Sequence, residues 1–479
     1  MTDIRMSLAF VFKFIERLLV KILGLVISIV LARLLEPDIF GLLAIISVFI
    51  NLANNFMLSG FGTALVQNRT ADHKDYSTVY YITLGSALVL MGVIICIAPY
   101  VAAAYSKPEL TMPLRVMAVS LIPGALNVVL NAKMQRELRF KEMMYCNLGA
   151  TVVAGIAGIL MAMYKPSIWA MVVYQCTGTV GLAAIMLPIC GWYPKIEFSG
   201  SRAMEFFSFG SKILASSMLC SLYADIRALI IGYRYSTADL AHYSKAQQFP
   251  EAIAYTVDSS MSSVVLAALS SLQESIKDMN DFLMKIVRIS VYIVVPLMMG
   301  LAAVSDTLVP LLLTEKWNSC IPLMKYFCFA NIVLPIITAG LCYIKACGRS
   351  DVFLRSEMLK RTIMISILMI TVFCFNSVKA IAFGVVFCTW IDAIVVIYAA
   401  KYCGAPKINE YFRLTWRTYF SGLVMFSIVT LLNKAICPTL LKLFFQIVCG
   451  GCIYVSTTIL VKDTAAIDIY GKIRAIWRR

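Results

Sequence analysis

Charged residues are scarce in this sequence and make up only 14% of its 479 residues. Soluble domains have about a quarter of their residues charged. Here 61% of the residues are hydrophobic and the mean hydropathy is +0.84. Apolar runs recur along the whole chain and leave no soluble domain of ordinary size between them. The composition therefore excludes an ordinary soluble protein and indicates an integral membrane protein.

The sequence also lacks the residues that most catalytic and metal centres need. Its two histidines, His73 and His242, fall in predicted loops on opposite sides of the membrane, which argues against a His-based metal centre or triad. There is no glycine-rich phosphate loop of the Walker A type. The 15 cysteines lie mostly within apolar segments and show no paired metal-ligand spacing. We therefore expect no enzyme activity, no cofactor and no metal.

The apolar runs predict about 14 helices that cross the membrane. If both termini are cytoplasmic, most Lys and Arg residues fall at the cytoplasmic ends of these helices, as the positive-inside rule requires. We read the net charge of +16 as this topology signal and expect no nucleic-acid partner. The predicted segments are Leu8–Leu35, Ile39–Gly62, Val79–Ala104, Thr111–Met134, Met143–Tyr164, Ser167–Cys190, Phe206–Tyr233, Tyr243–Leu269, Phe282–Ser305, Ser319–Ala346, Met358–Asn376, Val378–Lys401, Tyr411–Lys434 and Thr439–Val461.

Two similar halves are visible in the sequence. LARLLEPDIFGLLA, which ends the first segment, corresponds to LIIGYRYSTADLAHYSKA at the end of the seventh after a shift of 200 residues. Six helices in each half give the copies one orientation, which is the parallel-repeat plan of many transporters. We predict a six-helix lobe over 1–200, a second six-helix lobe over 201–402, and two further helices with a basic cytoplasmic tail over 403–479.

Three cations lie on one face of the first helix. Lys13, Arg17 and Lys21 are spaced i, i+4, i+8 in an otherwise apolar segment. A charge at membrane depth is costly and normally faces a water-filled cavity or a partner. This pattern suggests a cavity that receives an anionic lipid or a lipid-linked phosphate.

Polar faces occur at matching positions in segments 2 and 8. Asn51 and Asn55 correspond to Glu251 and Tyr255 at the 200-residue shift, and Asp258 continues the second face. We expect both faces to line one central cavity. The alternative is hydrogen bonding between helices within each lobe.

Other charged residues within the predicted helices have two possible roles. Arg227 and Arg115 extend the basic positions toward the outer side and could contact an anionic head group, or they could be structural charges. Asp258 and Asp392 are mid-membrane carboxylates that could couple transport to an ion, or could simply accept hydrogen bonds from nearby hydroxyl groups.

Five stretches of the sequence look like those of a known family. They are LARLLEPDIFGLLAII, AKMQRELRFKEM, AHYSKAQQFPEAIAYTVDSSMSSVVLAALSSLQ, GLAAVSDTLVPLLLTEKWNSCIPLMKYF and KACGRSDVFLRSEMLKR. They resemble the polysaccharide transporter family, the Wzx-type flippases of the multidrug, oligosaccharidyl-lipid and polysaccharide exporter superfamily. The resemblance covers nearly the whole chain, and its RELRF and EKW segments are fairly specific.

The resemblance implies an all-α, V-shaped, MATE-like bundle. It also implies that the chain flips undecaprenyl-diphosphate-linked oligosaccharides across a bacterial inner membrane for O-antigen, capsule or exopolysaccharide synthesis. Basic residues of helix 1 line the cavity in related peptidoglycan-lipid flippases, and Arg17 and Lys21 lie in a comparable region. Expected partners are the lipid-linked oligosaccharide, membrane lipids, a polysaccharide polymerase and glycosyltransferases. A cation-coupled multidrug exporter and a non-transporting scaffold of a polysaccharide-synthesis complex remain alternatives.

Overall fold

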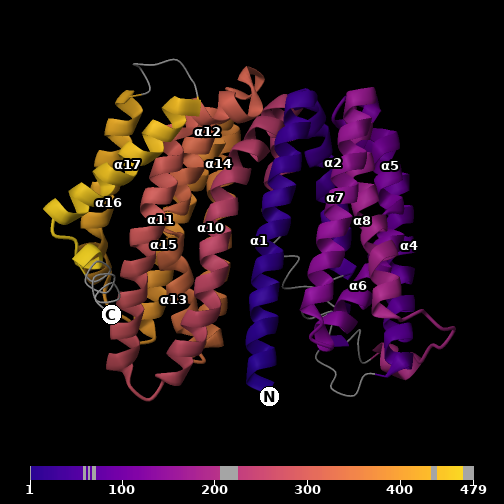
Figure 1. Ribbon diagram of the computed structural model, residues 1–479, viewed down its shortest axis with the longest axis horizontal. Helices are drawn as coiled ribbons and strands as arrows, with labels where there is room; N and C mark the ends of the chain where they lie inside the picture. Colours follow the sequence, from indigo (N-terminus) through magenta and orange to yellow (C-terminus); the bar gives the residue numbers. More distant parts are fainter. Residues whose placement is uncertain are drawn as a thin grey trace. The chain divides into compact units, whose positions relative to one another are not determined.

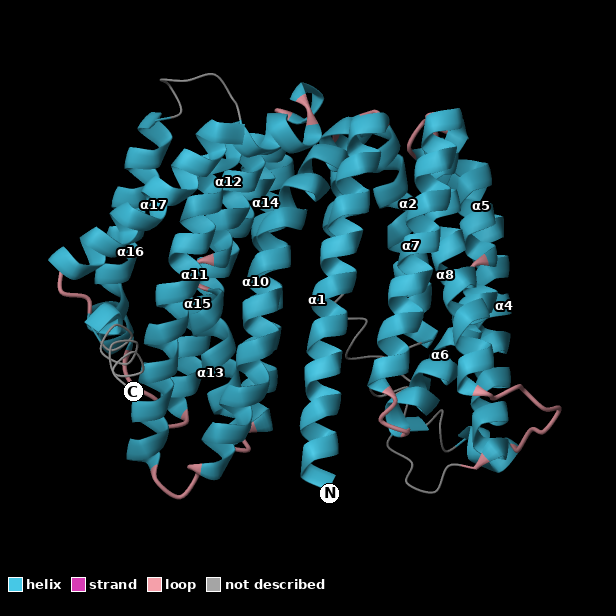
Figure 2. Cartoon of the chain, viewed as in Figure 1, coloured by secondary structure: helices cyan, strands magenta, loops and turns pink. Residues whose placement is uncertain are grey.

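All secondary structure in the described part of the chain is helical (Figure 2). The computed structural model describes residues 2–57, 61–62, 65–66, 72–204, 225–432 and 440–467, except for the side chains of residues 2–14, 259, 260 and 263. A helix satisfies its own backbone hydrogen bonds, so it is one of the two structures that can span hydrocarbon. The predicted all-α fold class is confirmed.

The chain forms two compact units, Met1–Ala241 and His242–Arg479. Within each unit the long helices run roughly parallel to one another (Figure 1). The first unit contains α1 (Thr2–Leu34), α2 (Pro37–Met57), α4 (His73–Ala104), the 3₁₀ turn η2 (Pro108–Leu110), α5 (Thr111–Val119), α6 (Leu121–Arg136), α7 (Phe140–Tyr164) and α8 (Ile168–Cys190). The chain passes into the second unit within α10 (Thr237–Ser271), which is followed by α11 (Ile276–Leu313), the 3₁₀ turn η3 (Glu315–Trp317), α12 (Cys320–Asn331), α13 (Leu334–Ala346), α14 (Ser350–Cys374), α15 (Val378–Tyr402), α16 (Ile408–Leu432) and α17 (Leu440–Leu460).

Many of these helices are long and apolar enough to cross a membrane. Nine such spans occur in the described part of the chain when α5 with α6, and α12 with α13, are each taken as one broken span. Most of predicted segment 7, Phe206–Tyr233, lies outside the described residues. The chain is therefore a multi-pass membrane protein, and the number 14 stays a prediction.

The order of elements repeats between the two units. Each has a long helix, a 3₁₀ turn and a broken span followed by two helices, so α4–η2–α5–α6–α7–α8 corresponds to α11–η3–α12–α13–α14–α15. The turn before α2 lies at residues 35–36, and the turn before α10 lies at residues 235–236. This agrees with the 200-residue shift predicted from the sequence.

The turn after each broken span has the same backbone geometry. Leu138 (φ 56°) follows α6 and Gly348 (φ 69°) follows α13, and both adopt the left-handed conformation. The next amide, of Arg139 or Arg349, bonds back to the carbonyl of Met134 (3.0 Å) or Ile344 (3.3 Å). This is the Schellman pattern that ends a helix. The shift between copies is 210 residues here, so the second copy carries about ten extra residues by this point.

The boundary between the compact units falls at Ala241 because residues 225–241 bond to the first unit. The Tyr105 hydroxyl donates to the Leu229 carbonyl at 3.0 Å, and the Thr237 hydroxyl donates to the Asp38 carboxylate. The lobe limits at residues 200 and 402 were predicted from the sequence repeat and not from packing. They stay predictions.

Prolines within two helices free a main-chain carbonyl, and a neighbouring helix supplies the missing donor. Pro99 in α4 has no N–H for the Ile95 carbonyl, which accepts from Arg115 Nε of α5 at 3.3 Å. Pro296 in α11 likewise frees the Tyr292 carbonyl, which accepts from the Tyr454 hydroxyl of α17 at 2.9 Å. These bonds tie the broken helices to their neighbours where water cannot satisfy the backbone.

We expect Tyr454→Phe to destabilise the protein by about 1–3 kcal/mol, because it removes the donor and leaves the buried Tyr292 carbonyl unsatisfied. The phenylalanine keeps the ring contact with Tyr292, whose centroid lies 5.3 Å away. Unfolding of the purified protein in detergent measures the loss.

Pro296→Ala gives the matched background for this test, because alanine restores an N–H for the same carbonyl. In a double-mutant cycle, Tyr454→Phe should cost much less in the Pro296→Ala protein than in the wild type. Equal costs in both backgrounds would contradict the assigned role of the Tyr454 hydroxyl.

Candidate functional site

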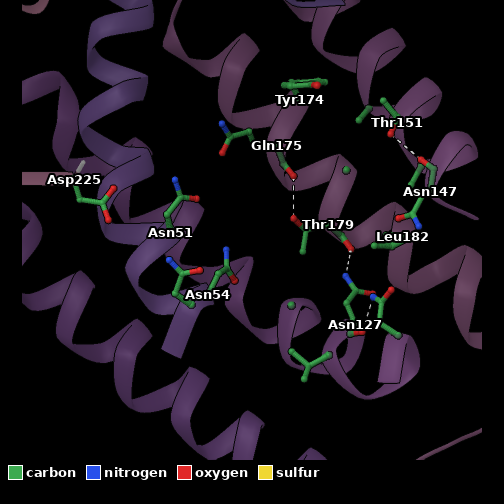
Figure 3. Close-up of a pocket in the computed structure, with 17 residues that line it drawn as sticks. Asn51, Asn54, Asn127, Asn147, Thr151, Tyr174, Gln175, Thr179, Leu182 and Asp225 are labelled. Carbon is green, nitrogen blue, oxygen red and sulfur yellow. Dashed lines mark hydrogen bonds between the residues drawn. The ribbon is translucent and has the colours of Figure 1, made fainter. Parts of the chain in front are cut away.

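A polar cavity of about 830 Å³ lies within the first unit, between α2, α6, α7, α8 and the chain at Asp225. Figure 3 shows the labelled side chains from these separate helices around one space. Six asparagines, one glutamine, two threonines and one tyrosine line it. Asp225 is the single charged residue among the described lining side chains. The polar lining residues are Asn51, Asn54, Asn55, Asn127, Asn131, Asn147, Thr151, Tyr174, Gln175, Thr179 and Asp225.

Each of the four helices brings two polar side chains to the cavity at a spacing of i, i+4. Residues four apart lie on the same face of a helix, so each pair points to one side of an otherwise apolar segment. Within α6, Asn131 Nδ2 donates to the Asn127 carbonyl at 2.8 Å. The pairs are Asn51 with Asn55, Asn127 with Asn131, Asn147 with Thr151, and Gln175 with Thr179.

Hydrogen bonds between helices fix the cavity walls. Asn127 Nδ2 of α6 donates to the Thr179 carbonyl of α8 at 2.9 Å, and this bond is visible in Figure 3. Asn147 Nδ2 of α7 donates to Glu16 Oε1 of α1 at 2.9 Å. Glu16 is 6% exposed, so the Asn147 amide helps to satisfy a buried carboxylate.

The two cavity walls formed by α7 and α8 are held together by close packing of these helices. A Cβ atom added at Gly158 of α7 would lie 2.7 Å from the Tyr174 Cβ of α8. Only glycine allows the two backbones to approach so closely. Tyr174 is thereby held at the cavity edge.

Two acceptor atoms at the cavity have no hydrogen-bond partner in the described part of the chain. They are Asn127 Oδ1 and Asp225 Oδ2, and both are buried. A buried acceptor without a donor costs about 1–3 kcal/mol. Both atoms are shielded from the open space of the cavity, so they belong to its wall and do not by themselves identify a ligand.

The predicted cation face of α1 does not line this cavity. Arg17 and Lys21 are exposed, and the Lys13 side chain lies outside the described residues. Glu16 is buried next to Asn147. One face of α1 thus packs on α7, while a neighbouring face presents Arg17 and Lys21.

The other predicted basic residues occupy different positions. Asp225 lines the cavity, whereas Arg227 is buried and does not appear among the lining side chains. This agrees with the expectation that residues i and i+2 point apart. Arg115 donates to the carbonyl freed by Pro99, which is the contact of a structural charge.

In the second unit, the predicted polar residues of α10 are bonded to neighbouring side chains. Gln247 donates to Glu251, and the Thr338 hydroxyl of α13 donates to the Asp258 carboxylate. Tyr255 is exposed. A cavity shared by α2 and α10 would involve both units and stays a prediction.

Asp392 of α15 is half-buried and lies within the electrostatic influence of Glu357, Lys360 and Arg361 of α14. Lys360 and Arg361 both pair with Glu357. Ion coupling at Asp258 or Asp392 remains a prediction. No group of three or more His, Cys, Asp or Glu side chains in the described ranges is placed to hold a metal ion.

Five polar lining residues of α7 and α8 were not singled out from the sequence. They sit in α7 and α8, where the two i, i+4 pairs interrupt long apolar runs, and that spacing is the signal that could have identified four of them. Tyr174 has no such signal. These residues are Asn147, Thr151, Tyr174, Gln175 and Thr179.

Sequence comparisons relate the chain to proteins of surface-polysaccharide synthesis. A family model described as "polysaccharide biosynthesis protein" matches residues 30–322. The chain is also 22% identical over 354 residues to the lipopolysaccharide biosynthesis protein WzxC of Escherichia coli (strain K12). That match covers 73% of this chain and 71% of WzxC.

Solved membrane transporters share the fold. The lipid II flippase MurJ in an inward closed conformation superposes with a TM-score of 0.74 at 13% identity, covering 96% of this chain and 99% of MurJ. An inward-facing multidrug resistance MATE family transporter of the MOP superfamily has a TM-score of 0.60 at 14% identity, covering 88% of this chain and all of the transporter. These similarities confirm the predicted MATE-like fold.

A cysteine placed in the polar cavity should react with a charged thiol reagent, because the reaction needs the water-stabilised thiolate. We expect Asn51→Cys to be labelled in a variant whose 15 native cysteines have been replaced. Mass spectrometry of the labelled protein in membranes gives the extent of reaction.

Val89→Cys is the matched control, because Val89 is 67% exposed on the apolar surface of α4. It should stay unlabelled in lipid. Labelling at neither position, or at Val89→Cys alone, would show that the cavity does not hold water.

Proposed function

The chain belongs to the polysaccharide biosynthesis protein family, and from this premise we propose that it is a lipid-linked oligosaccharide flippase. It would carry undecaprenyl-diphosphate-linked repeat units from the cytoplasmic to the periplasmic leaflet of a bacterial inner membrane. The product would serve O-antigen, capsule or exopolysaccharide synthesis. The role is transport and not catalysis.

The observation that carries this proposal is the polar lining of the cavity in the first unit, which is uncharged apart from Asp225. Amide side chains offer both donors and acceptors, which matches the hydroxyl groups of a neutral sugar. A glycan in hydrocarbon would lose these hydrogen bonds at a cost of several kcal/mol for each group. Six asparagines around one open cavity supply replacements for the lost water.

The charge of the lining supports a sugar over an anionic ligand. Asp225 is the single charged residue among the described lining side chains, and it is acidic. A diphosphate has acceptors but few donors, and the Asp225 carboxylate would repel it. The cavity chemistry therefore fits the glycan and leaves the diphosphate to another part of the protein.

We assign the diphosphate to Arg17 and Lys21 on α1. Both are exposed, and their side chains carry the charge that phosphate oxygens require. Glu16 and Asn147 fix the rotation of this helix from its other side. The polyprenyl tail would stay in the surrounding lipid during the crossing.

Translocation would follow an alternating-access cycle between states open to either leaflet. An ion gradient or the membrane potential would supply the energy, with Asp258 and Asp392 as the carboxylates to test. Both termini would lie in the cytoplasm, as the distribution of basic residues indicates. The glycosyltransferases would act before this step, and the polysaccharide polymerase would act after it.

Two rival functions give different results in a deletion strain. If the protein is a multidrug exporter, its deletion would leave surface glycan unchanged and would sensitise the cells to cationic drugs. A scaffold would reduce surface glycan without build-up of a lipid intermediate. A flippase predicts loss of surface glycan together with accumulation of the lipid-linked unit.

Replacing both Arg17 and Lys21 with alanine should slow flipping by at least about tenfold, because each lost charge-assisted hydrogen bond is worth about 1.5–3 kcal/mol. Mass spectrometry of polyprenyl-linked lipids from a complemented deletion strain would then show the oligosaccharide intermediate accumulating.

The control is the double variant Arg17→Lys, Lys21→Arg, which keeps both charges and should restore export. Immunoblotting of membranes confirms that each variant is produced. A well-produced alanine double variant that exports glycan at the wild-type rate would remove these residues from the mechanism.

A further inference from the structure

A second cavity, a groove of about 490 Å³, lies in the second unit between the first turns of α14 and the last turns of α15. Its lining is mostly apolar, with one arginine, one serine and two tyrosines. The lining residues are Val352, Arg355, Ser356, Leu359, Ile394, Val395, Tyr398, Ala399 and Tyr402.

The groove changes from polar to apolar along the helices. Tyr402 is the last residue of α15 and Arg355 lies five residues after the start of α14, so both are within about 8 Å of a helix end. Leu359 and Ile394 lie one to two turns deeper. Arginine and tyrosine near a helix end are typical of the head-group layer of a bilayer, and the deeper aliphatic side chains match the acyl region.

Among the described basic residues of α14, Arg355 is the one without a carboxylate partner. Its neighbours differ: Arg349, just before α14, bonds Asp351 at 2.9 Å, and both Lys360 and Arg361 pair with Glu357. Arg355 is exposed and lines the groove. An anion bound there would meet an unneutralised guanidinium, which holds phosphate oxygens in a bidentate geometry.

Tyr402 extends this polar end of the groove. The Arg349 guanidinium stacks on its ring with the central carbon 5.6 Å from the ring centroid. The ring is therefore held at the groove mouth by a second cation. Arg355, Tyr398 and Tyr402 are therefore the polar side chains that the groove offers to a head group, together with Ser356.

We propose that this groove binds an anionic glycerophospholipid, with its phosphate on Arg355 and one acyl chain along Leu359 and Ile394. Basic pockets between transmembrane helices on the cytoplasmic side are a recurrent form of such sites. The groove has no asparagine, glutamine or carboxylate among its described lining residues, so it offers no partners for the glycan of the transported lipid. The bilayer lipid is the occupant that fits, and this site is independent of the proposed flipping function.

The test uses the purified full-length protein and phosphatidylglycerol as the probe, with phosphatidylcholine as the zwitterionic reference. Native mass spectrometry counts bound lipids over a concentration series. Wild-type protein should bind phosphatidylglycerol more tightly than phosphatidylcholine. Arg355→Ala should weaken phosphatidylglycerol binding by about tenfold, the effect of losing a charged hydrogen bond. It should weaken phosphatidylcholine binding less, because the choline ammonium already offsets the charge of that lipid's phosphate.

Two further variants separate the phosphate contact from general effects. Leu359→Trp should also reduce binding, because the larger side chain fills the groove where the acyl chain lies. Arg413→Ala removes an arginine that is likewise exposed in the first turns of a helix, α16, but does not line the groove. It should bind phosphatidylglycerol as the wild type does.

Three results would overturn the proposal. One is equal phosphatidylglycerol affinity in Arg355→Ala and the wild type. Another is an equal loss in Arg413→Ala, which would indicate non-specific attraction to basic residues. The third is displacement of bound phosphatidylglycerol by an equal concentration of undecaprenyl phosphate, which would assign the groove to the polyprenyl lipid instead.

Discussion

The absence of water in the hydrocarbon layer makes a polar group there costly unless it finds a partner within the protein. This constraint explains the unusual bonds of the structure. The carbonyls freed by Pro99 and Pro296 are met by Arg115 and Tyr454 from other helices. Glu16 is met by Asn147 of α7. Each such bond fixes the position of one helix relative to another, where apolar contacts alone would leave many packings of similar energy.

The same constraint explains why a polar lining in the cavity of the first unit points to a polar substrate. Where polar groups meet their partners, they join helices, as the Asn147 amide of α7 and the Glu16 carboxylate of α1 do. In the cavity, amide and hydroxyl side chains from four helices instead line open space that a polar substrate can enter. Uncharged amides suit a substrate with many hydroxyl groups that must move through an apolar layer. The cations on α1 suit a phosphate that must move with it.

Much of the fold could be predicted from the sequence because the bilayer restricts the choices. Apolar runs of membrane length predict helices, and the turn at residues 235–236 lies 200 residues after its counterpart, as the repeat predicts. The breaks at α5–α6 and α12–α13 were harder to place. A proline in the sequence indicates that a helix can bend there, but it does not indicate which neighbouring helix packs against the bend. The donors that satisfy freed carbonyls come from distant helices, and sequence spacing carries no information about them.

The site was only partly predictable for the same reason. The face of Asn51 and Asn55 was visible as polar periodicity. The pairs on α7 and α8 have the same spacing but lie in segments where serine, threonine and glycine often serve packing alone. Arg115 was grouped with possible head-group ligands because a cation within a helix suggests function, whereas its bond to Ile95 follows from a proline 16 residues earlier in the chain.

The central claim is that the cavity of the first unit carries the glycan, and direct flipping by the purified protein tests it. Proteoliposomes would contain a fluorescent undecaprenyl-diphosphate oligosaccharide, and dithionite added outside would quench the label in the outer leaflet. We predict that wild-type protein exposes the full label pool and that the Asn51→Leu, Asn55→Leu variant leaves the inner-leaflet half protected. A folded leucine variant that flips the lipid at the wild-type rate would contradict the account.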